Sequence, residues 1–331
     1  MIITKPDYYD RFRCAGGSCP DSCCQSWEVD VDEASAARYR SLPGPLGDRL
    51  RNALEEGEDG TFIAIENGRC PLWEDDGLCG LQKALGETEL CQVCRTFPRL
   101  QHDYGDFMEL GLELSCPEAA RYILASPQPS MVTEEVPGGD PPDYDREDMA
   151  LLRSSRETMR ALLSDPRRPF GQCLCLGLLY GCQVQSALDG GTLEDLDEAQ
   201  ALSQAAAWAK PGSMGEILAL FSGLEILTPQ WRELLSHPEP AQWEPGHRAL
   251  ARYLVDRYWL QAVSDLDIYG RVKFLVTACL TVRHLGGNLL RTAQLFSKEI
   301  ENDWDNLDAL LTAAYESPAL RDDRLFGLLL L

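Results

Sequence analysis

The sequence is poor in basic residues and in histidine. Its 331 residues include 30 lysines and arginines against 53 aspartates and glutamates, which leaves a formal net charge of −23, and only 4 histidines. A field of that sign repels phosphate backbones and anionic lipid surfaces. We therefore expect no nucleic-acid partner and no membrane partner, and the scarcity of histidine argues against a histidine-rich zinc site.

Long apolar runs are also missing. No stretch approaches the roughly 18 apolar residues that a membrane-spanning helix needs. The opening segment Met1–Pro6 lacks the basic and apolar regions of a secretory signal. We accordingly expect a cytoplasmic, globular protein, and its oligomeric state stays open.

Several common catalytic and nucleotide-binding motifs are absent. The chain has no Gly-x-Gly-x-x-Gly after a strand, no Walker loop, no His-Glu-x-x-His and no nucleophile elbow. The triplet Cys-x3-Cys-x2-Cys is missing too, because the position that should follow Cys19-x3-Cys23 is Ser26. These absences leave a Rossmann-type cofactor site and a conventional radical cluster site without support.

Cysteine, by contrast, is abundant and clustered. Nine of the 13 cysteines lie in the first 116 residues, namely Cys14, Cys19, Cys23, Cys24, Cys70, Cys79, Cys91, Cys94 and Cys116. A reducing compartment disfavours disulfides and favours metal binding or thiol chemistry. Thiolates bind soft or borderline metals, and a site needs about four of them, so this region supplies ligands for one or two centres.

The spacing of these cysteines leaves the metal and its role open. It matches neither the Cys-x2-Cys pairs of zinc ribbons nor a ferredoxin run, so zinc and an iron–sulfur cluster both fit. A metal that only holds a small domain together and a metal that takes part in catalysis explain the cluster equally well. A third interpretation, a redox dithiol at Cys91-x2-Cys94, requires both thiols to be unligated and reactive.

Other residues have ordinary interpretations beside functional ones. We interpret four further cysteines in apolar segments as buried small hydrophobic side chains: Cys173, Cys175, Cys182 and Cys279. Arg95 and Arg99 flank Phe97-Pro98 and could bind a carboxylate or an anionic cluster. A surface salt bridge explains these two arginines at least as well.

The first 125 residues are rich in turn signals and short extended segments. Strands are expected at 61–65 and 107–114. Asp76-Gly77 is a hairpin-turn signal that would bring Cys70 and Cys79 together. Pro117, directly after Cys116, is expected at the first position of a helix.

The rest of the chain is expected to be helical. Residues 126–146 are dense in proline, glycine and acid, which predicts a linker. Apolar residues at three-to-four spacing then predict helices over 148–163, 170–188, 194–209, 214–227, 247–263, 269–285 and 289–304. The predicted fold class is mostly α (α+β): a cysteine-rich, metal-bound module with short strands over 1–125, the linker over 126–146 and a helical domain over 147–331. The helix that begins at Tyr269 is apolar nearly all round and should be buried.

An ordered set of sequence blocks resembles one known family. The blocks are Phe12-x-Cys14-x4-Cys19-x3-Cys23-Cys24-x2-Trp27, then Val29-Asp-Val-Asp32, Cys70-Pro-Leu, Gly77-Leu-Cys79-x-Leu-Gln-Lys-x-Leu-Gly-Glu87, Cys94-Arg-Thr-Phe-Pro-Arg99, Ser115-Cys-Pro-Glu-Ala-Ala-Arg121, Tyr253-Leu-Val followed by Tyr258, and Tyr269-Gly-Arg-Val-Lys-Phe274. They are similar to flagellin lysine-N-methylases of the FliB family, within the wider group of cysteine-cluster zinc- or iron-chelating proteins. The resemblance spans most of the chain.

The resemblance implies an activity and a metal centre. The activity is transfer of methyl groups from S-adenosylmethionine to flagellin lysines in the bacterial cytoplasm, with a 4Fe-4S iron–sulfur cluster on the cysteines and zinc as the alternative. Carried over by position, the metal ligands are Cys14, Cys19, Cys23, Cys24, Cys70, Cys79, Cys94 and Cys116, whereas Cys91 falls outside the pattern. No motif identifies a methyl-transfer residue or an S-adenosylmethionine site. The alternative from the same cysteines is a non-catalytic metal-binding adaptor or metal-handling protein.

Lysine methylation also sets a chemical requirement. A lysine with a pKa of about 10.4 is an ammonium, so a base or a desolvated channel must remove its proton. Tyr253, Tyr258 and Tyr269 lie in the matched helical half, but amphipathic core packing explains them better.

Overall fold

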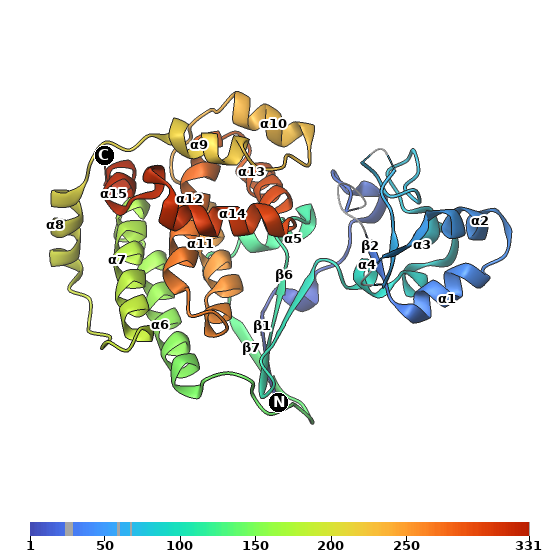
Figure 1. Ribbon diagram of the computed structural model, residues 1–331, viewed down its shortest axis with the longest axis horizontal. Helices are drawn as coiled ribbons and strands as arrows, with labels where there is room; N and C mark the ends of the chain where they lie inside the picture. Colours follow the sequence, from blue (N-terminus) through green and yellow to red (C-terminus); the bar gives the residue numbers. More distant parts are fainter. Residues whose placement is uncertain (24–28, 58–59, 67, 331) are drawn as a thin grey trace.

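The computed structural model describes residues 1–23, 29–57, 60–66 and 68–330. It shows a mixed α+β protein, as predicted, in which a small module lies beside a larger helical body (Figure 1). The chain leaves the body after Phe12, forms the module, and returns through Phe97.

The module combines a small antiparallel sheet with short helices. Its strands, in sheet order, are β2 (Val29–Val31), β4 (Gly60–Ile63) and β3 (Leu54–Gly57). Its helices are α1 (Glu33–Ser41), α2 (Gly44–Ala53), α3 (Gly80–Leu85) and α4 (Gln92–Thr96). Val29 and Val31 are buried and Asp30 between them is exposed, which is the two-residue period of a half-buried strand. Asp32 then caps α1 by accepting a hydrogen bond from the Ser35 amide at 3.0 Å.

A second sheet lies against the helical body. Its order is β5 (Arg99–Asp103), β6 (Phe107–Leu112), β1 (Ile2–Pro6) and β7 (Met131–Glu135). β1 runs parallel to β6, and the other neighbours are antiparallel. β6 confirms the strand predicted at 107–114, and β4 lies at the one predicted at 61–65. β7 falls inside 126–146, where the proline and glycine content gave no indication of a strand.

Helices build the rest of the body. They are α5 (Pro117–Leu124), α6 (Arg146–Ser164), α7 (Phe170–Leu188), α8 (Glu198–Trp208), α9 (Met214–Ser222), α10 (Pro229–Ser236), α11 (Pro245–Tyr258), α12 (Ile268–Leu285), α13 (Leu289–Phe296), α14 (Trp304–Glu316) and α15 (Asp322–Leu330). A π-helical turn over Ser297–Glu301 links α13 to α14. The predicted buried helix is α12, which is covered on nearly all sides. Pro117 opens α5, as expected. None of the helices in the described residues has both the length and the apolarity needed to cross a bilayer.

The apolar side chains form two cores. The larger core joins Phe12 and Phe107 to helical residues such as Leu152 and Phe296. The smaller core belongs to the module and includes Val29, Leu50, Leu72 and Leu81. Chain segments on both sides of 126–146 therefore share one core, and the division at 125 and 146 stays a prediction.

The cysteines of the helical half are mostly buried, as expected. Cys173, Cys175 and Cys279 have no exposed surface, which confirms that interpretation. It is wrong for Cys182, which is exposed. Cys182 lies on the face of α7 that also carries Cys175, but it is near Asp322, the first residue of α15, and remains exposed.

Candidate functional site

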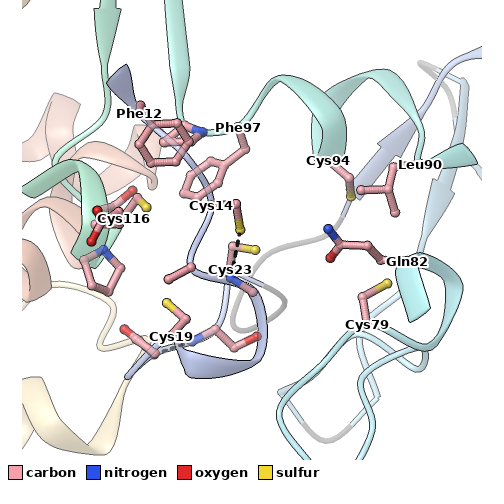
Figure 2. Close-up of a pocket in the computed structure, with 18 of the residues that line it drawn as sticks. Phe12, Cys14, Cys19, Cys23, Cys79, Gln82, Leu90, Cys94, Phe97 and Cys116 are labelled. Atoms are coloured by element: carbon pink, nitrogen blue, oxygen red, sulfur yellow. Dashed lines mark hydrogen bonds between the residues drawn. The ribbon is translucent and has the colours of Figure 1, made fainter. Parts of the chain in front are cut away.

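A pocket of about 270 Å³ lies where the module faces the helical body. Three chain segments form its wall: residues 12–23, residues 77–99 and residues 115–118, with Lys298 and Asn302 added from the helical half. Six of the described cysteines line it: Cys14, Cys19, Cys23, Cys79, Cys94 and Cys116 (Figure 2). The fold thus brings six of the eight predicted ligands to one pocket, although they are spread over about a hundred residues of sequence.

The cysteines approach the pocket from opposite sides (Figure 2). Cys14, Cys19 and Cys23 stand on the loop that leaves the body, and Cys79 and Cys94 stand across from it on the module. The loop is shaped by a 3₁₀ turn at Gly16–Ser18, where Gly16 has a φ of 53°. The Gly16 amide donates a hydrogen bond to the Cys14 sulfur at 3.4 Å. A positive φ at this position favours glycine, so the turn depends on that residue.

Cys79 and Cys116 share a local setting, since each caps the N-terminus of a helix. Burial raises the pKa of both thiols, that of Cys116 to about 12. Backbone amides of the first helical turn act in the opposite direction, those of Ala119 and Glu118 on Cys116. These thiols are therefore protonated at neutral pH unless a metal displaces the proton, and the same amides would then stabilise the thiolate.

A second cavity, of about 30 Å³, lies inside the module. It is lined by the cysteines Cys23, Cys70, Cys79, Cys91 and Cys94. The turn at Gly77 forms as predicted and pairs Trp73 with Cys79, so Cys70 and Cys79 do meet. Cys70 thus lies behind the pocket rather than on its wall. Cys24, another predicted ligand, lies outside the described residues.

The redox interpretation of Cys91-x2-Cys94 gains no support from the structure. The hydrogen bond between the two thiols lowers the pKa of Cys91 to about 7 and raises that of Cys94. Cys91 is, however, only 1% exposed. A dithiol that exchanges with another protein needs an accessible sulfur.

The donor set fits a soft metal in its chemistry. Thiols are the ligands that zinc and iron–sulfur clusters prefer. Within residues 1–23, 29–57, 60–66 and 68–330, however, no three Cys, His, Asp or Glu side chains lie together as a ready-made ion site. The assignment of ligands therefore stays a prediction.

The pocket is more basic than the protein as a whole. Its wall carries four cations, Arg13, Arg95, Arg99 and Lys298, and three carboxylates, Asp21, Glu87 and Glu118. In a chain of net charge −23 this local excess of cations is unusual. It suits an anionic occupant, such as a thiolate-rich centre or a carboxylate.

Asp21 fastens the cysteine loop to the helical body. Its carboxylate accepts hydrogen bonds from Gln294 at 2.9 Å, Arg291 at 3.0 Å and Lys298 at 3.3 Å. Although burial acts to raise it, the charge of Lys298 and these hydrogen bonds hold the pKa of Asp21 below its usual range. Lys298 also donates to the Ser22 carbonyl at 3.0 Å from the π-helical turn.

The sequence alone did not indicate that Gln294 and Lys298 would bind Asp21. Gln294 has no exposed surface and also donates to the Ser115 carbonyl at 2.7 Å, so it joins the loop of Cys19 to the residue before Cys116. A glutamine on a predicted amphipathic helix is not distinguishable from a surface residue by type alone. Lys298 could have been singled out only as one of the chain's five lysines.

The three candidate tyrosines lie outside the pocket wall. Tyr253 and Tyr258 are buried and donate to Glu301 at 3.2 Å and 2.8 Å. Arg257 donates to the Tyr253 hydroxyl at 2.7 Å. Burial raises the pKa of both hydroxyls, and that of partly buried Tyr269, so all three keep their proton at neutral pH and do not supply a phenolate base. The core interpretation of Tyr253 and Tyr258 is confirmed.

Comparison with known proteins finds relatives over part of the chain. It is 30% identical over 145 residues to the Lysine-N-methylase of Salmonella typhimurium strain LT2 and equally to that of Salmonella choleraesuis; each match covers 41% of this chain and 36% of the relative. It is 28% identical over 148 residues to the Flagellar biosynthetic protein FliU of Salmonella muenchen, a match that covers 41% of this chain and 84% of that protein.

These matches are partial. The chain spans little more than a third of the length of either lysine-N-methylase. No known protein-family profile matches the chain, and no solved structure shows significant similarity to it. Over part of its length, then, the chain is similar to proteins named lysine-N-methylase.

Proposed function

We propose that this protein is an S-adenosylmethionine-dependent lysine N-methyltransferase that acts on flagellin and contains a cysteine-ligated metal centre. The observation that carries the proposal is the convergence of six cysteines from three separate segments on one pocket. The partial similarity to proteins named lysine-N-methylase gives the reaction. The flagellar name of a third relative supports flagellin as the substrate.

The proposed metal ligands are the cysteines of the pocket and those next to it. Cys14, Cys19, Cys23, Cys79, Cys94 and Cys116 line the pocket, Cys70 lies behind Cys79, and Cys24 completes the set. An iron–sulfur cluster of the 4Fe-4S type is the proposed centre, with zinc as the alternative. Either metal would add charge at the pocket and tie the loop to the module.

The reaction itself needs little from the metal. S-adenosylmethionine supplies a methyl group on a sulfonium; the new N–C bond forms as the C–S bond breaks, and the electron pair stays on sulfur. The chain must take the proton of the lysine ammonium. Asp21 is already held by three side-chain donors and the Ser22 amide. This leaves exposed Glu87, and Glu118, paired with Arg121 at 2.6 Å, as the carboxylates of the pocket wall that can face an incoming lysine.

The test is the intact mass of flagellin from the same organism, co-expressed with the wild type, with Cys23→Ser and with Cys182→Ser. Methyl increments that map to lysines are expected with the wild type and with Cys182→Ser, because Cys182 lies far from the pocket. They are expected to be absent with Cys23→Ser. Increments in all three samples would separate the activity from the metal site.

The second candidate is a non-catalytic metal-binding adaptor, which the same thiol-lined pocket favours. It predicts a folded, metal-loaded wild type beside unmodified flagellin. That result would replace the methyltransferase proposal.

A further inference from the structure

Two arginines on the pocket wall have guanidinium groups without a hydrogen-bond acceptor or ion-pair partner within the described part of the chain. Arg13 donates to the carbonyl oxygens of Asp10 and Phe12 at 2.8 Å and 2.6 Å, and Lys298 is paired with Asp21. Arg95 and Arg99 also line the pocket, but among the described residues the side chain of neither forms an ion pair or a hydrogen bond. The surface salt bridge that would have explained them is therefore not formed there.

Partly buried arginines of the helical body bond an acceptor. Arg156 binds Glu109 through two hydrogen bonds of 2.7 Å and 2.6 Å, and Arg160 contacts Asp256 at 2.6 Å. Arg248 and Arg283 have no carboxylate partner but donate to backbone carbonyls. The guanidinium groups of Arg95 and Arg99 have neither kind of acceptor among the described residues, so on the pocket wall they are donors available to an anionic ligand.

The two side chains flank one turn of the chain. Arg95 lies in α4 and Arg99 opens β5, with Phe97-Pro98 between them. The Arg99 guanidinium lies over the ring of Phe12, 5.2 Å from its centroid, so its position is fixed by an aromatic face. Phe12 and Phe97 lie close to each other on the pocket wall (Figure 2). The site therefore offers one planar cation, Arg99, directly beside aromatic surface, with Arg95 on the same pocket wall.

We propose that Arg95 and Arg99 bind the carboxylate of the methionyl group of S-adenosylmethionine, with Phe97 beside its apolar part. The inference rests on the proposed function and adds a binding site for the methyl donor to it. A guanidinium matches a carboxylate with two parallel N–H···O bonds, and a charged bond of that kind is stronger in a partly enclosed pocket than in water. The pocket volume, about 270 Å³, is just below the lower end of the range for small-ligand sites.

The test compares ligands that differ in the carboxylate. The metal-loaded wild type, Arg95→Gln, Arg99→Lys and the variant with both changes are titrated with S-adenosylhomocysteine and with methylthioadenosine, which lacks the amino-acid end. Arg95 is exposed, so its replacement should not disturb folding; a thermal unfolding curve checks each variant. Arg167→Gln is the control, because Arg167 is 84% exposed in its side chain, lies outside the pocket and pairs with Asp165.

We expect the double variant to bind S-adenosylhomocysteine about tenfold to a hundredfold more weakly, the loss that one or two charged hydrogen bonds predict. Methylthioadenosine should bind all proteins equally, and Arg167→Gln should behave as the wild type. Equal affinity of wild type and pocket variants for S-adenosylhomocysteine would overturn the inference and leave the proposed function standing.

Two other outcomes are also decisive. A folded wild type that binds no S-adenosylhomocysteine would overturn the proposed function itself. Pocket variants that lose iron and sulfide, while their loaded fraction binds S-adenosylhomocysteine normally, would overturn the inference and assign the two arginines to the metal centre.

Discussion

The carboxylate of Asp21, on the cysteine-bearing loop, accepts a hydrogen bond of 2.9 Å from the side-chain amide of Gln294, on α13. The same amide group donates to the Ser115 carbonyl, next to Cys116. One buried side chain of the helical half thus sets the distance between two cysteine-bearing segments. The contact therefore contributes to the geometry of the pocket.

Asp21→Asn should destabilise the protein strongly. The change leaves the Lys298 ammonium, 6% exposed, without its counter-charge, and breaking a buried ion pair costs about 3 kcal/mol. The free energy of unfolding in urea measures the loss. Asp308→Asn, an exposed acid on α14, is the matched control and should change it little. Equal stability of the two variants would show that Asp21 does not anchor the loop.

The contribution of Asp21 should also depend on pH in a defined direction. Its folded pKa is lowered, so its stabilising effect is complete above the unfolded pKa of about 3.9 and is lost as pH falls through the folded value. The difference in unfolding free energy between wild type and Asp21→Asn should therefore be constant near neutrality and shrink in acid. Titrating both proteins by urea unfolding from pH 7 to strongly acidic pH checks this, and a difference that grew on acidification would contradict it.

Metal content should follow the pocket rather than cysteine number. Cys79→Ser, from the pocket wall, should reduce iron, sulfide or zinc per chain after anaerobic purification and lower stability. Cys182→Ser and Cys279→Ser should leave the metal content unchanged, because one is at the surface and the other in the core of α12. Elemental analysis and the visible absorption spectrum give the result. The same metal content in every variant would refute the ligand assignment.

Tyr253→Phe should separate a structural role from a catalytic one. Removing the hydroxyl leaves the buried Leu114 amide without an acceptor and takes one of two acceptors from Arg257, which keeps Glu301 at 3.4 Å; the loss costs about 1 to 3 kcal/mol. Methyl transfer to flagellin should continue at a temperature where the variant is folded. Loss of transfer in the folded variant would instead place the hydroxyl in the reaction.

The helices of the C-terminal half could be predicted from the sequence because the spacing of apolar residues that indicates a helix is a local pattern. Each predicted helix between 148 and 304 has a counterpart, and the all-apolar stretch after Tyr269 is the buried α12. The ends of the helices were predicted less accurately. The helix predicted over 214–227 ends at Ser222, before Gly223, and the helix predicted over 289–304 becomes a π-helix at Ser297. α10, α14 and α15 had no prediction.

The site could be predicted only as a set of residue types. Spacing and resemblance selected eight cysteines, six of which line one pocket, because clustered thiols are typical metal ligands. The partners that position them were not predictable, since Gln294 reaches Asp21 across 273 residues of sequence. Likewise, β7 forms by pairing with β1, which lies more than 120 residues earlier in the sequence, and the local composition of residues 126–146 does not predict this pairing.

The thiol-lined pocket occupies the crossing point between two separately cored bodies. Both stretches of chain that connect them, residues 13–23 and the turn at Phe97, form part of its wall. A metal or ligand bound in the pocket would contact both connecting stretches of chain at once. Binding in the pocket would therefore also restrain the small module relative to the helical body.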